Sequence, residues 1–482
     1  MQLRDPSLLR EQCYVGGAWV GDPATAVTDP ATGEAIARVP RFGAAETRRA
    51  IDAAHAAFPA WARKTGKERA RLLRAWFDLM MASREDLALI MTTEQGKPLA
   101  EALGEIDYAA GFIEFSGEEA KRVYGETSLS HRQDARIVVI KQPIGVVGAI
   151  TPWNFPAAMI TRKCVPALAA GCTVVCKPAG ETPLTALALA VLAERAGIPA
   201  GVFNVITGKA SEIGEELTSS PDVHCIAFTG STEVGKLLMR QAASTVKKVA
   251  LELGGNAPFI VFDDAEIDQA VEGAIFSKFR NMGQTCICAN RIFVQDSVYD
   301  AFAGKLSEAV AKLKVGRGTE AGVVQGPLIN MAAVEKVEHH IGDAVAKGAT
   351  IVTGGHRHRL GGTFFEPTVL KDVSRDMLIT REETFGPVAP LYRFKDEAEA
   401  IALANATEFG LAAYFYARDV GRVWRVAEAL EYGMVGINSG AISTELAPFG
   451  GVKESGLGRE GSHYGVEEFI EVKYMLMGGL DR

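Results

Sequence analysis

Short apolar runs alternate along this chain with longer stretches of helical periodicity. Runs rich in β-branched residues are typical of strands buried on both faces, whereas Ala and Leu at helical spacing predict covering helices. In the middle of the chain we expect strands at 173–176, 202–206, 226–228, 249–253 and 258–262, and helices at 183–196 and 232–243. This alternation predicts a mostly parallel sheet with helices on both faces.

The same alternation resumes after residue 290. There we expect strands at 291–294, 350–353 and 434–437, and helices at 298–314, 397–404 and 420–430. A chain of 482 residues is too long for one hydrophobic core. The sequence therefore predicts an α/β protein with two domains that divide near Gly254-Gly255.

Two segments, 127–141 and 470–477, fit neither domain. The second places Ile470, Val472 and Tyr474 on one face of an extended strand. Both segments predict projecting antiparallel strands whose apolar side chains need a partner. Pairing with another subunit is the hypothesis that explains them.

Composition narrows the class of protein. The net charge of −8, without a long Lys/Arg run, argues against a nucleic-acid partner. The longest apolar run, 184–193, is too short to span a membrane. Seven dispersed cysteines indicate reduced thiols rather than a disulfide framework. With no apolar signal region at the N-terminus, we expect a cytoplasmic enzyme.

Cys286 carries the strongest chemical signal. It lies in Gly-Gln-Thr-Cys-Ile-Cys-Ala-Asn-Arg at 283–291, among small or neutral residues and five positions before Arg291. An ionised thiol is a strong nucleophile, and a fixed cation nearby could hold an anionic substrate. A buried structural cysteine is the alternative. Cys288 is either a partner for a reversible disulfide with Cys286 or a small residue that fills space.

Two polar residues follow predicted strands, where open α/β sheets place their ligands. Asn154, in Thr-Pro-Trp-Asn at 151–154, offers an amide to an oxyanion, or simply occupies a turn. Lys177 could reach a ribose or a phosphate, or remain solvated.

The string Gly230 to Lys236 nearly matches a P-loop. However, Leu237 stands where a hydroxyl should bind Mg²⁺, which opposes a phosphohydrolase. A glycine turn that opens a helix can still hold a phosphate.

Two carboxylates adjoin glycines. Glu252, between leucines, could become a general base if it is desolvated, or could form a salt bridge. Glu383 could bind ribose hydroxyls, with Phe385 packing on a flat cofactor, or both could belong to a plain loop. The Cys and His residues show no metal-ligand spacing, so we expect no metal.

Taken in order, these strings resemble the aldehyde dehydrogenase superfamily, from Thr-Pro-Trp-Asn at 151–154 to Lys-Glu-Ser-Gly at 453–456. The resemblance implies two Rossmann-like open-sheet α/β domains, a small β oligomerisation flap, and a homodimer or homotetramer. The implied ranges are 1–125 and 146–253 for the dinucleotide-binding domain, 254–464 for the catalytic domain, and 126–145 and 465–482 for the flap.

The resemblance also implies a mechanism. Cys286 attacks the aldehyde, and Asn154 and the Cys286 backbone N–H hold the oxyanion. Hydride transfer to a nicotinamide leaves a thioester, which a water activated by Glu252 hydrolyses. The implied cofactor site comprises Thr151, Pro152, Trp153, Lys177, Ala179, Gly180, Gly230, Ser231, Val234, Leu253, Glu383 and Phe385.

Within the superfamily the chain looks most like succinate-semialdehyde dehydrogenases. Arg162, Arg291 and Ser443 match the positions that bind the substrate carboxylate there, and guanidinium groups suit that ligand. Glutarate semialdehyde, one methylene longer, is the alternative substrate. Gly180 stands where many NAD-preferring relatives have a glutamate, whose carboxylate would repel the 2′-phosphate of NADP. We therefore expect NADP to be preferred over NAD. The carboxylate of Glu181, the next residue, weakens this expectation.

Two other classes of protein fit the sequence less well. An inactive relative would have lost Cys286, Glu252 or Asn154, and all three are present. A CoA-acylating dehydrogenase would use the same thiol, but Glu252 favours hydrolysis by water.

Overall fold

The first sheet gathers strands from both ends of the chain. The computed structural model describes residues 1–480, and in it eight strands lie in the order β19-β11-β10-β7-β8-β9-β1-β2. The five central strands are parallel: β11 (Lys248–Glu252), β10 (Val223–Thr229), β7 (Val146–Ile150), β8 (Thr173–Lys177) and β9 (Phe203–Val205). The antiparallel strands β1 (Cys13–Val15) and β2 (Ala18–Val20) extend one edge.

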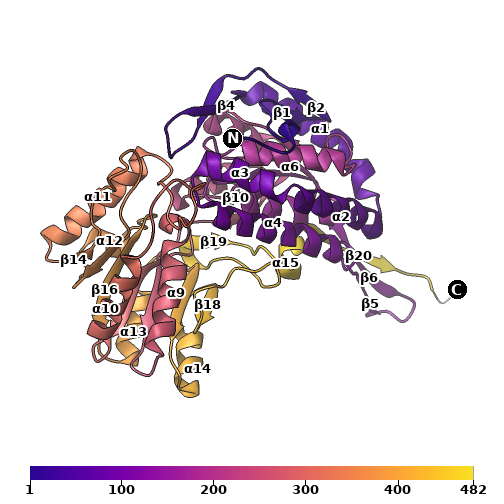
Figure 1. Cartoon of the computed structure of the whole chain (residues 1–482). Helices are drawn as coiled ribbons and strands as arrows, with labels where there is room; N and C mark the ends of the chain where they lie inside the picture. Colours follow the sequence, from indigo (N-terminus) through magenta and orange to yellow (C-terminus); the bar gives the residue numbers. More distant parts are fainter. Residues whose placement is uncertain (481–482) are drawn as a thin grey trace.

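Helices cover both faces of this sheet (Figure 1). They are α1 (Ala44–Ala62), α2 (Gly66–Ala82), α3 (Arg84–Gln95), α4 (Leu99–Glu119), α5 (Ala158–Ala170), α6 (Leu184–Arg195), α7 (Ala210–Ser219) and α8 (Thr232–Ala242). Every residue of α5 is buried, as are the first ten of α6. A helix that is buried on all sides needs other elements packed around it, so the outer layer of α2, α3 and α4 is needed to cover these two helices.

The second sheet has seven strands in the order β14-β15-β16-β13-β12-β17-β18. Their bounds are β12 (Ala257–Val261), β13 (Ala289–Gln295), β14 (Thr350–Thr353), β15 (Thr368–Lys371), β16 (Val388–Phe394), β17 (Ala412–Tyr416) and β18 (Met434–Ile437). Its helices are α9 (Ile267–Phe279), α10 (Tyr299–Val310), α11 (Met331–Ala346), α12 (Leu378–Arg381), α13 (Glu397–Asn405) and α14 (Val420–Ala429). All strands but β14 run parallel, so the predicted α/β class with two open sheets is confirmed.

The chain then returns to the first domain. The strand β19 (Gly456–Leu457) pairs with β11, and α15 (Ser462–Glu467) follows it and packs against α5. The expected end of the catalytic domain at residue 464 is therefore wrong, because hydrogen bonds to β11 place 456–457 in the first sheet. This return lays the C-terminal segment across the junction of the two domains.

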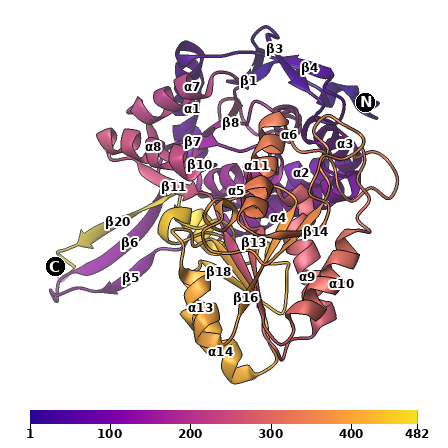
Figure 2. The ribbon, with the colours of Figure 1, turned by 90° about the vertical axis from the view of Figure 1, so that its left-hand side faces the viewer.

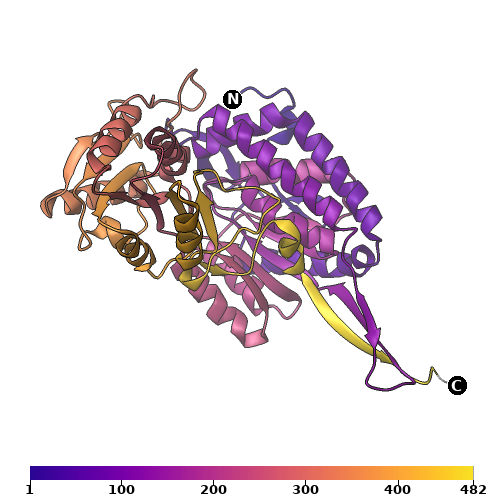
Figure 3. The same ribbon diagram turned by 90° about the horizontal axis from the view of Figure 1, so that it is seen from below.

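A three-stranded antiparallel arm projects from the first domain (Figures 2 and 3). It consists of β5 (Glu126–Leu129), β6 (Arg136–Pro143) and β20 (Ile470–Met477). β6 and β20 pair from Ile470 with Pro143 to Met477 with Arg136. Val472 and Tyr474 are 67% and 57% exposed, so the arm leaves apolar surface uncovered. Residues 481–482, the end of the expected 465–482 segment, lie outside the described residues.

Smaller elements complete the described chain. They are β3 (Thr25–Thr28), β4 (Ala35–Val39) and the 3-10 turns η1 (Pro6–Leu8), η2 (Ala243–Thr245), η3 (Arg280–Gly283) and η4 (Lys453–Ser455). None of the helices in residues 1–480 is both long and apolar enough to cross a bilayer.

Candidate active site

A cavity of about 360 Å³ lies where the carboxyl ends of the first sheet meet the second domain. Parallel strands expose their chain ends at one edge, so loops far apart in sequence converge there. The lining comprises Pro152, Trp153, Asn154, Thr229, Gly230, Ser231, Leu253, Gly254, Cys286, Ile329, Asn330, Ala332, Ala333, Lys336, Glu383, Thr384 and Phe385. Nine of the residues predicted for the site are therefore together in one lining.

Cys286 sits at the end of this cavity, in the loop between η3 and β13. Burial raises the pKa of its thiol to about 12, against the opposing charge of Arg162. At neutral pH the resting thiol is therefore protonated, and it must lose its proton to react. Cys288 is fully buried, and its sulfur contacts the Thr285 hydroxyl and the Lys278 carbonyl.

Asn154, just after β7, is oriented by one hydrogen bond. Its Nδ2 donates to the Gln284 carbonyl at 2.9 Å. The reverse orientation would set two oxygens against each other, so the amide nitrogen must face Gln284. Its second N–H is not used by any hydrogen bond within residues 1–480 and can serve a ligand beside Cys286.

Glu252 ends β11 and is only 3% exposed. Burial, and then the nearby charge of Glu460, raise the pKa of this carboxyl well above its usual value. Its Oε2 has no hydrogen-bond partner in the described chain. It is absent from the cavity lining, yet it is close enough for its charge to raise the pKa of Cys286. A carboxyl whose pKa is raised by burial is a stronger base than an exposed one and is suited to accept a proton.

A second, smaller pocket also includes Cys286 in its lining. Its lining comprises Tyr108, Phe155, Met159, Arg162, Arg280, Thr285, Cys286, Ile287, Ser443 and Phe449. The Arg162 guanidinium lies 3.9 Å from the centre of the Phe449 ring, and Arg280 lies 4.7 Å from that of Phe155. Two cations, three hydroxyl groups and aromatic rings therefore line the same pocket as the thiol.

The two cations differ in their partners. Arg162 is buried, and its Nε donates to Glu460 at 2.6 Å. Glu460 also pairs with Lys163. Burial would raise the pKa of Glu460, but the charges of Arg162 and Lys163 lower it. Arg280 makes no ion pair or hydrogen bond through its side chain anywhere in residues 1–480. It is therefore the cation most available to an anionic ligand.

Arg291, predicted for the substrate site, does not lie there. Its guanidinium donates to the carbonyls of Asn256, Leu403 and Ala404 and to the Tyr432 hydroxyl, at 2.9–3.1 Å. Arg291 is an internal residue of β13, and the strand directs its side chain toward α13 rather than toward Cys286. The expectation of a carboxylate clamp that includes Arg291 is therefore wrong.

Arg280 takes the place expected for Arg291, and sequence reasoning missed it. Asn281 and Met282, which follow it, have left-handed backbone conformations with φ of 51° and 57°. These residues reverse the chain after α9 and bring Arg280 back beside Cys286. The Asn-Met-Gly sequence was the available signal, because Asn and Gly tolerate this conformation.

The remaining predicted cofactor residues lie outside the lining of the 360 Å³ cavity. These are Thr151, Lys177, Ala179, Gly180 and Val234. Lys177 is 5% exposed, and its pKa is lowered by burial although Glu181 opposes this. Gly180 is exposed, and a Cβ added there would meet nothing within 4 Å.

Several features at the carboxyl ends of β7 and β10 suit a dinucleotide. Ser231 caps α8, and its Oγ accepts a hydrogen bond from the Val234 N–H at 3.3 Å. The Thr151 and Thr229 hydroxyls are buried without hydrogen-bond partners in the described residues. Orphaned donors beside a helix N-terminus fit a ligand with phosphate and sugar oxygens.

Glu383 and Phe385 line the opposite wall. Burial raises the pKa of Glu383 to about 7, although it accepts a hydrogen bond from the Gly255 N–H at 3.2 Å. The Phe385 ring meets Trp153 edge-on, with ring centres 5.6 Å apart. This wall offers a carboxyl group next to flat rings.

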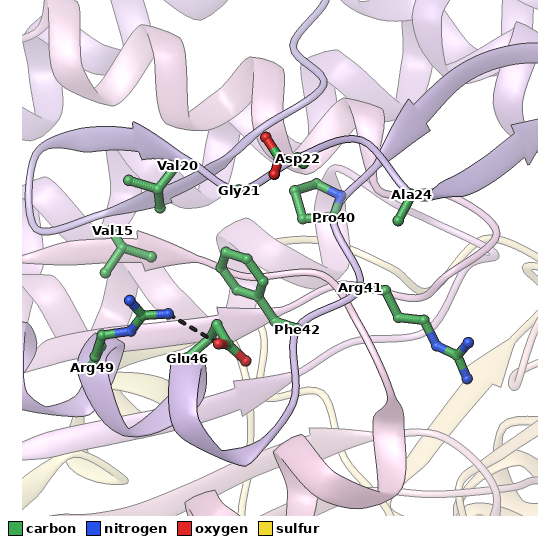
Figure 4. Close-up of a pocket in the computed structure, with 10 residues that line it drawn as sticks. All are labelled: Val15, Val20, Gly21, Asp22, Ala24, Pro40, Arg41, Phe42, Glu46 and Arg49. Carbon is green, nitrogen blue, oxygen red and sulfur yellow. Dashed lines mark hydrogen bonds and ion pairs between the residues drawn. The ribbon is translucent and has the colours of Figure 1, made fainter.

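Another cavity, of about 550 Å³, lies at the N-terminal edge of the first domain (Figure 4). Glu46 and Arg49 in its wall form an ion pair with each other at 3.0 Å. It contains no nucleophile and none of the predicted residues. Among the residues that the structure describes, no cluster of three or more His, Cys, Asp or Glu side chains could hold a metal ion.

Comparison with known proteins identifies the family. The model of the aldehyde dehydrogenase family matches residues 19–475. A glutarate-semialdehyde dehydrogenase of Pseudomonas aeruginosa is 66% identical, with all of both chains covered. The NADP+ succinate-semialdehyde dehydrogenase GabD of Escherichia coli is 64% identical over 99% of this chain and 100% of its own. The crystal structure of succinate-semialdehyde dehydrogenase from Burkholderia pseudomallei superposes with a TM-score of 0.98 at 65% identity, over 99% of this chain and 100% of that one. The resemblance seen in the sequence is confirmed, and the chain belongs to the aldehyde dehydrogenase family.

Proposed function

We propose that this protein oxidises succinate semialdehyde to succinate, with NADP or NAD as the hydride acceptor. The observation that carries the proposal is the smaller pocket, whose lining Cys286 shares with Arg162 and Arg280. A pocket lined by both a nucleophile and cations matches an aldehyde that carries a carboxylate. Glutarate semialdehyde is an equally supported alternative, since relatives named for each substrate are similarly close.

The carboxylate end is assigned to Arg280, Arg162 and Ser443. Arg280 forms no ion pair in the described chain, although it lies close enough to Glu101 to oppose the rise that burial causes in the pKa of that carboxyl, so it supplies the larger share of the attraction. Arg162 already shares its charge with Glu460 and contributes less. The aromatic walls keep water away from these ion pairs and thereby strengthen them.

The chemistry begins at Cys286, whose thiolate attacks the aldehyde carbon. The free N–H of Asn154 and the backbone N–H of Cys286 stabilise the resulting oxyanion. A bound nicotinamide would supply the hydride acceptor, and the loss of hydride from the thiohemiacetal would leave a thioester on Cys286. Glu252 takes a proton from the water that hydrolyses this thioester, as its raised pKa favours.

Residues on both walls of the larger cavity would hold the cofactor. Lys177 and Glu383 would bind ribose hydroxyls, and Gly230 and Ser231 would lie near the pyrophosphate. The open space at Gly180 leaves room for a 2′-phosphate, which supports a preference for NADP. The E. coli relative is named for NADP+.

We also propose that the arm joins subunits into a homodimer or homotetramer. Exposed apolar residues along β20 support this, because an uncovered strand of this kind favours pairing with another chain. All seven cysteines are free, which supports a reducing, cytoplasmic setting.

A panel of aldehydes tests the substrate. We expect kcat/KM for succinate and glutarate semialdehydes to exceed that for uncharged aldehydes of equal length about 100-fold, the effect of a charged hydrogen bond. Each aldehyde is measured with NADP and with NAD. Equal values for charged and uncharged aldehydes would overturn the proposed substrate class.

A further inference from the structure

A fully buried ion pair lies directly behind the active site. Lys97, in the turn between α3 and α4, is 2% exposed, and its partner Glu105 in α4 is 1% exposed. Neither residue lines either cavity that contains Cys286. Burying two charges is costly, and an apolar pair would often be as stable. The pair therefore calls for an explanation other than stability.

The two side chains form hydrogen bonds with the backbone at both ends of the turn that carries Asn154. Lys97 Nζ donates to the Asn154 carbonyl at 2.8 Å. Glu105 Oε1 accepts hydrogen bonds from the backbone N–H groups of Ala157 at 3.0 Å and Ala158 at 3.2 Å. Because the pair holds the backbone on both sides of the turn, it fixes the direction of the Asn154 side chain. Apolar residues could fill this space but could not make these bonds.

Asn281 ties the same turn to the loop of Cys286 in the other domain. Its Nδ2 donates to the Asn154 carbonyl at 3.0 Å, and its Oδ1 accepts from Gln95 at 3.0 Å. The Asn281 N–H donates to Glu101 at 2.9 Å. These contacts hold the left-handed conformation that places Arg280 on one side of the turn and Gln284, the acceptor for Asn154, on the other.

We propose that Lys97 and Glu105 are positioning residues for the oxyanion site. They act through Asn154, whose amide they hold in line with Cys286, and Asn281 extends this hold across the domain junction. The inference rests on the proposed function, since it concerns the same oxyanion. The side chains touch neither substrate nor cofactor, so their effect is on the rate of the chemical step rather than on binding.

A double-mutant cycle between Lys97→Met and Asn154→Ala tests the proposal. In single-turnover assays of the whole protein, we expect Lys97→Met to slow reduced-cofactor formation about 30-fold, which is less than the roughly 100- to 1,000-fold loss when an oxyanion donor is removed outright. KM should change less than about threefold, and equally for charged and uncharged aldehydes. In the Asn154→Ala background the same change should slow the reaction less than about twofold, because its target is gone.

Arg69→Met is the matched control. Arg69 is also a buried cation that donates to a backbone carbonyl of α5, that of Ala169 at 2.9 Å, but at the far end of the helix. We expect it to lower the melting temperature without slowing the first turnover. If Lys97→Met does not fold, Lys97→Met/Glu105→Gln removes both charges, and Asn281→Ala removes an uncharged amide that donates to Asn154 and accepts from Gln95.

Two outcomes overturn the positioning role. One is an unchanged single-turnover rate in the folded Lys97 or Asn281 variants. The other is a full, multiplicative loss in the Asn154→Ala background, which would show a general structural effect. A wild-type protein that oxidises no aldehyde would instead refute the proposed function itself.

Discussion

Cys286 lies between two linings that are built in different ways: that of the larger cavity, the cofactor wall, and that of the smaller pocket, the substrate wall. The cofactor wall combines backbone and small residues at strand ends, such as Gly230 and Gly254, with the larger side chains of Trp153, Glu383 and Phe385. The substrate wall is made of long side chains from separate elements, with Tyr108 on α4, Arg162 on α5 and Arg280 after α9. Backbone recognises features that dinucleotides share, whereas side chains recognise the tail of one class of aldehyde. The difference indicates that cofactor binding and substrate choice can be altered separately.

The largest effect is expected from a change at Glu252, which lines neither the cofactor wall nor the substrate wall and should therefore alter the binding of neither ligand. We expect Glu252→Gln to lower steady-state kcat about 1,000-fold, the loss typical of a missing general base. The first turnover should still release one reduced cofactor per active site, because hydrolysis comes later. Quench-flow assays would measure both. A large change in KM for only one ligand would instead assign Glu252 to that wall.

A change at Arg280 tests the substrate wall alone. We expect Arg280→Met to lower kcat/KM for succinate semialdehyde about 50-fold through the loss of a charged hydrogen bond. Values for an uncharged aldehyde and KM for NADP should hardly change. Arg291→Met is the control, since that side chain binds backbone carbonyls of the second domain. It should reduce thermal stability and leave the ratio of charged to uncharged substrates intact.

The thiol between the walls should respond to pH. Because burial raises the pKa of Cys286 to about 12, its thiolate fraction grows with pH throughout the neutral range. We expect alkylation by iodoacetamide, followed by peptide mass spectrometry, to accelerate about tenfold per pH unit from 7 to 9. Arg162→Met should slow it at any one pH, because Arg162 favours the thiolate. A plateau near pH 7 would contradict the raised pKa.

The smallest effect is expected on the cofactor wall, at Gly180. A Cβ added there would meet nothing within 4 Å, and the carboxylate of a glutamate would repel a 2′-phosphate. We expect Gly180→Glu to shift the ratio of kcat/KM for NADP over NAD toward NAD about tenfold, or ~1.4 kcal/mol. Gly180→Gln, of similar size without the charge, should shift it less. A change in aldehyde preference would break the separation between the walls.

The contrast between the walls also explains which predictions succeeded. The βαβ alternation fixed the strands, since buried parallel strands must be apolar and their ends must carry the loops. Residues next to those ends, such as Asn154, Gly230 and Glu383, could be read from local strings. Their predicted roles remain proposals, but the structure brings them into one cavity.

What the chain's sequence alone determined was the family, the two-sheet α/β architecture and the cofactor wall, because each depends on local pattern. Only the tertiary structure decided the substrate wall. Arg291 and Arg280 lie at similar distances from Cys286 in sequence, on opposite sides. The direction of β13 buries the first under α13, and the left-handed turn at Asn281 returns the second to the thiol. The ion pair of Lys97 and Glu105 was equally invisible, because its partners at 154–158 meet it only when α4 packs on α5 within the first domain.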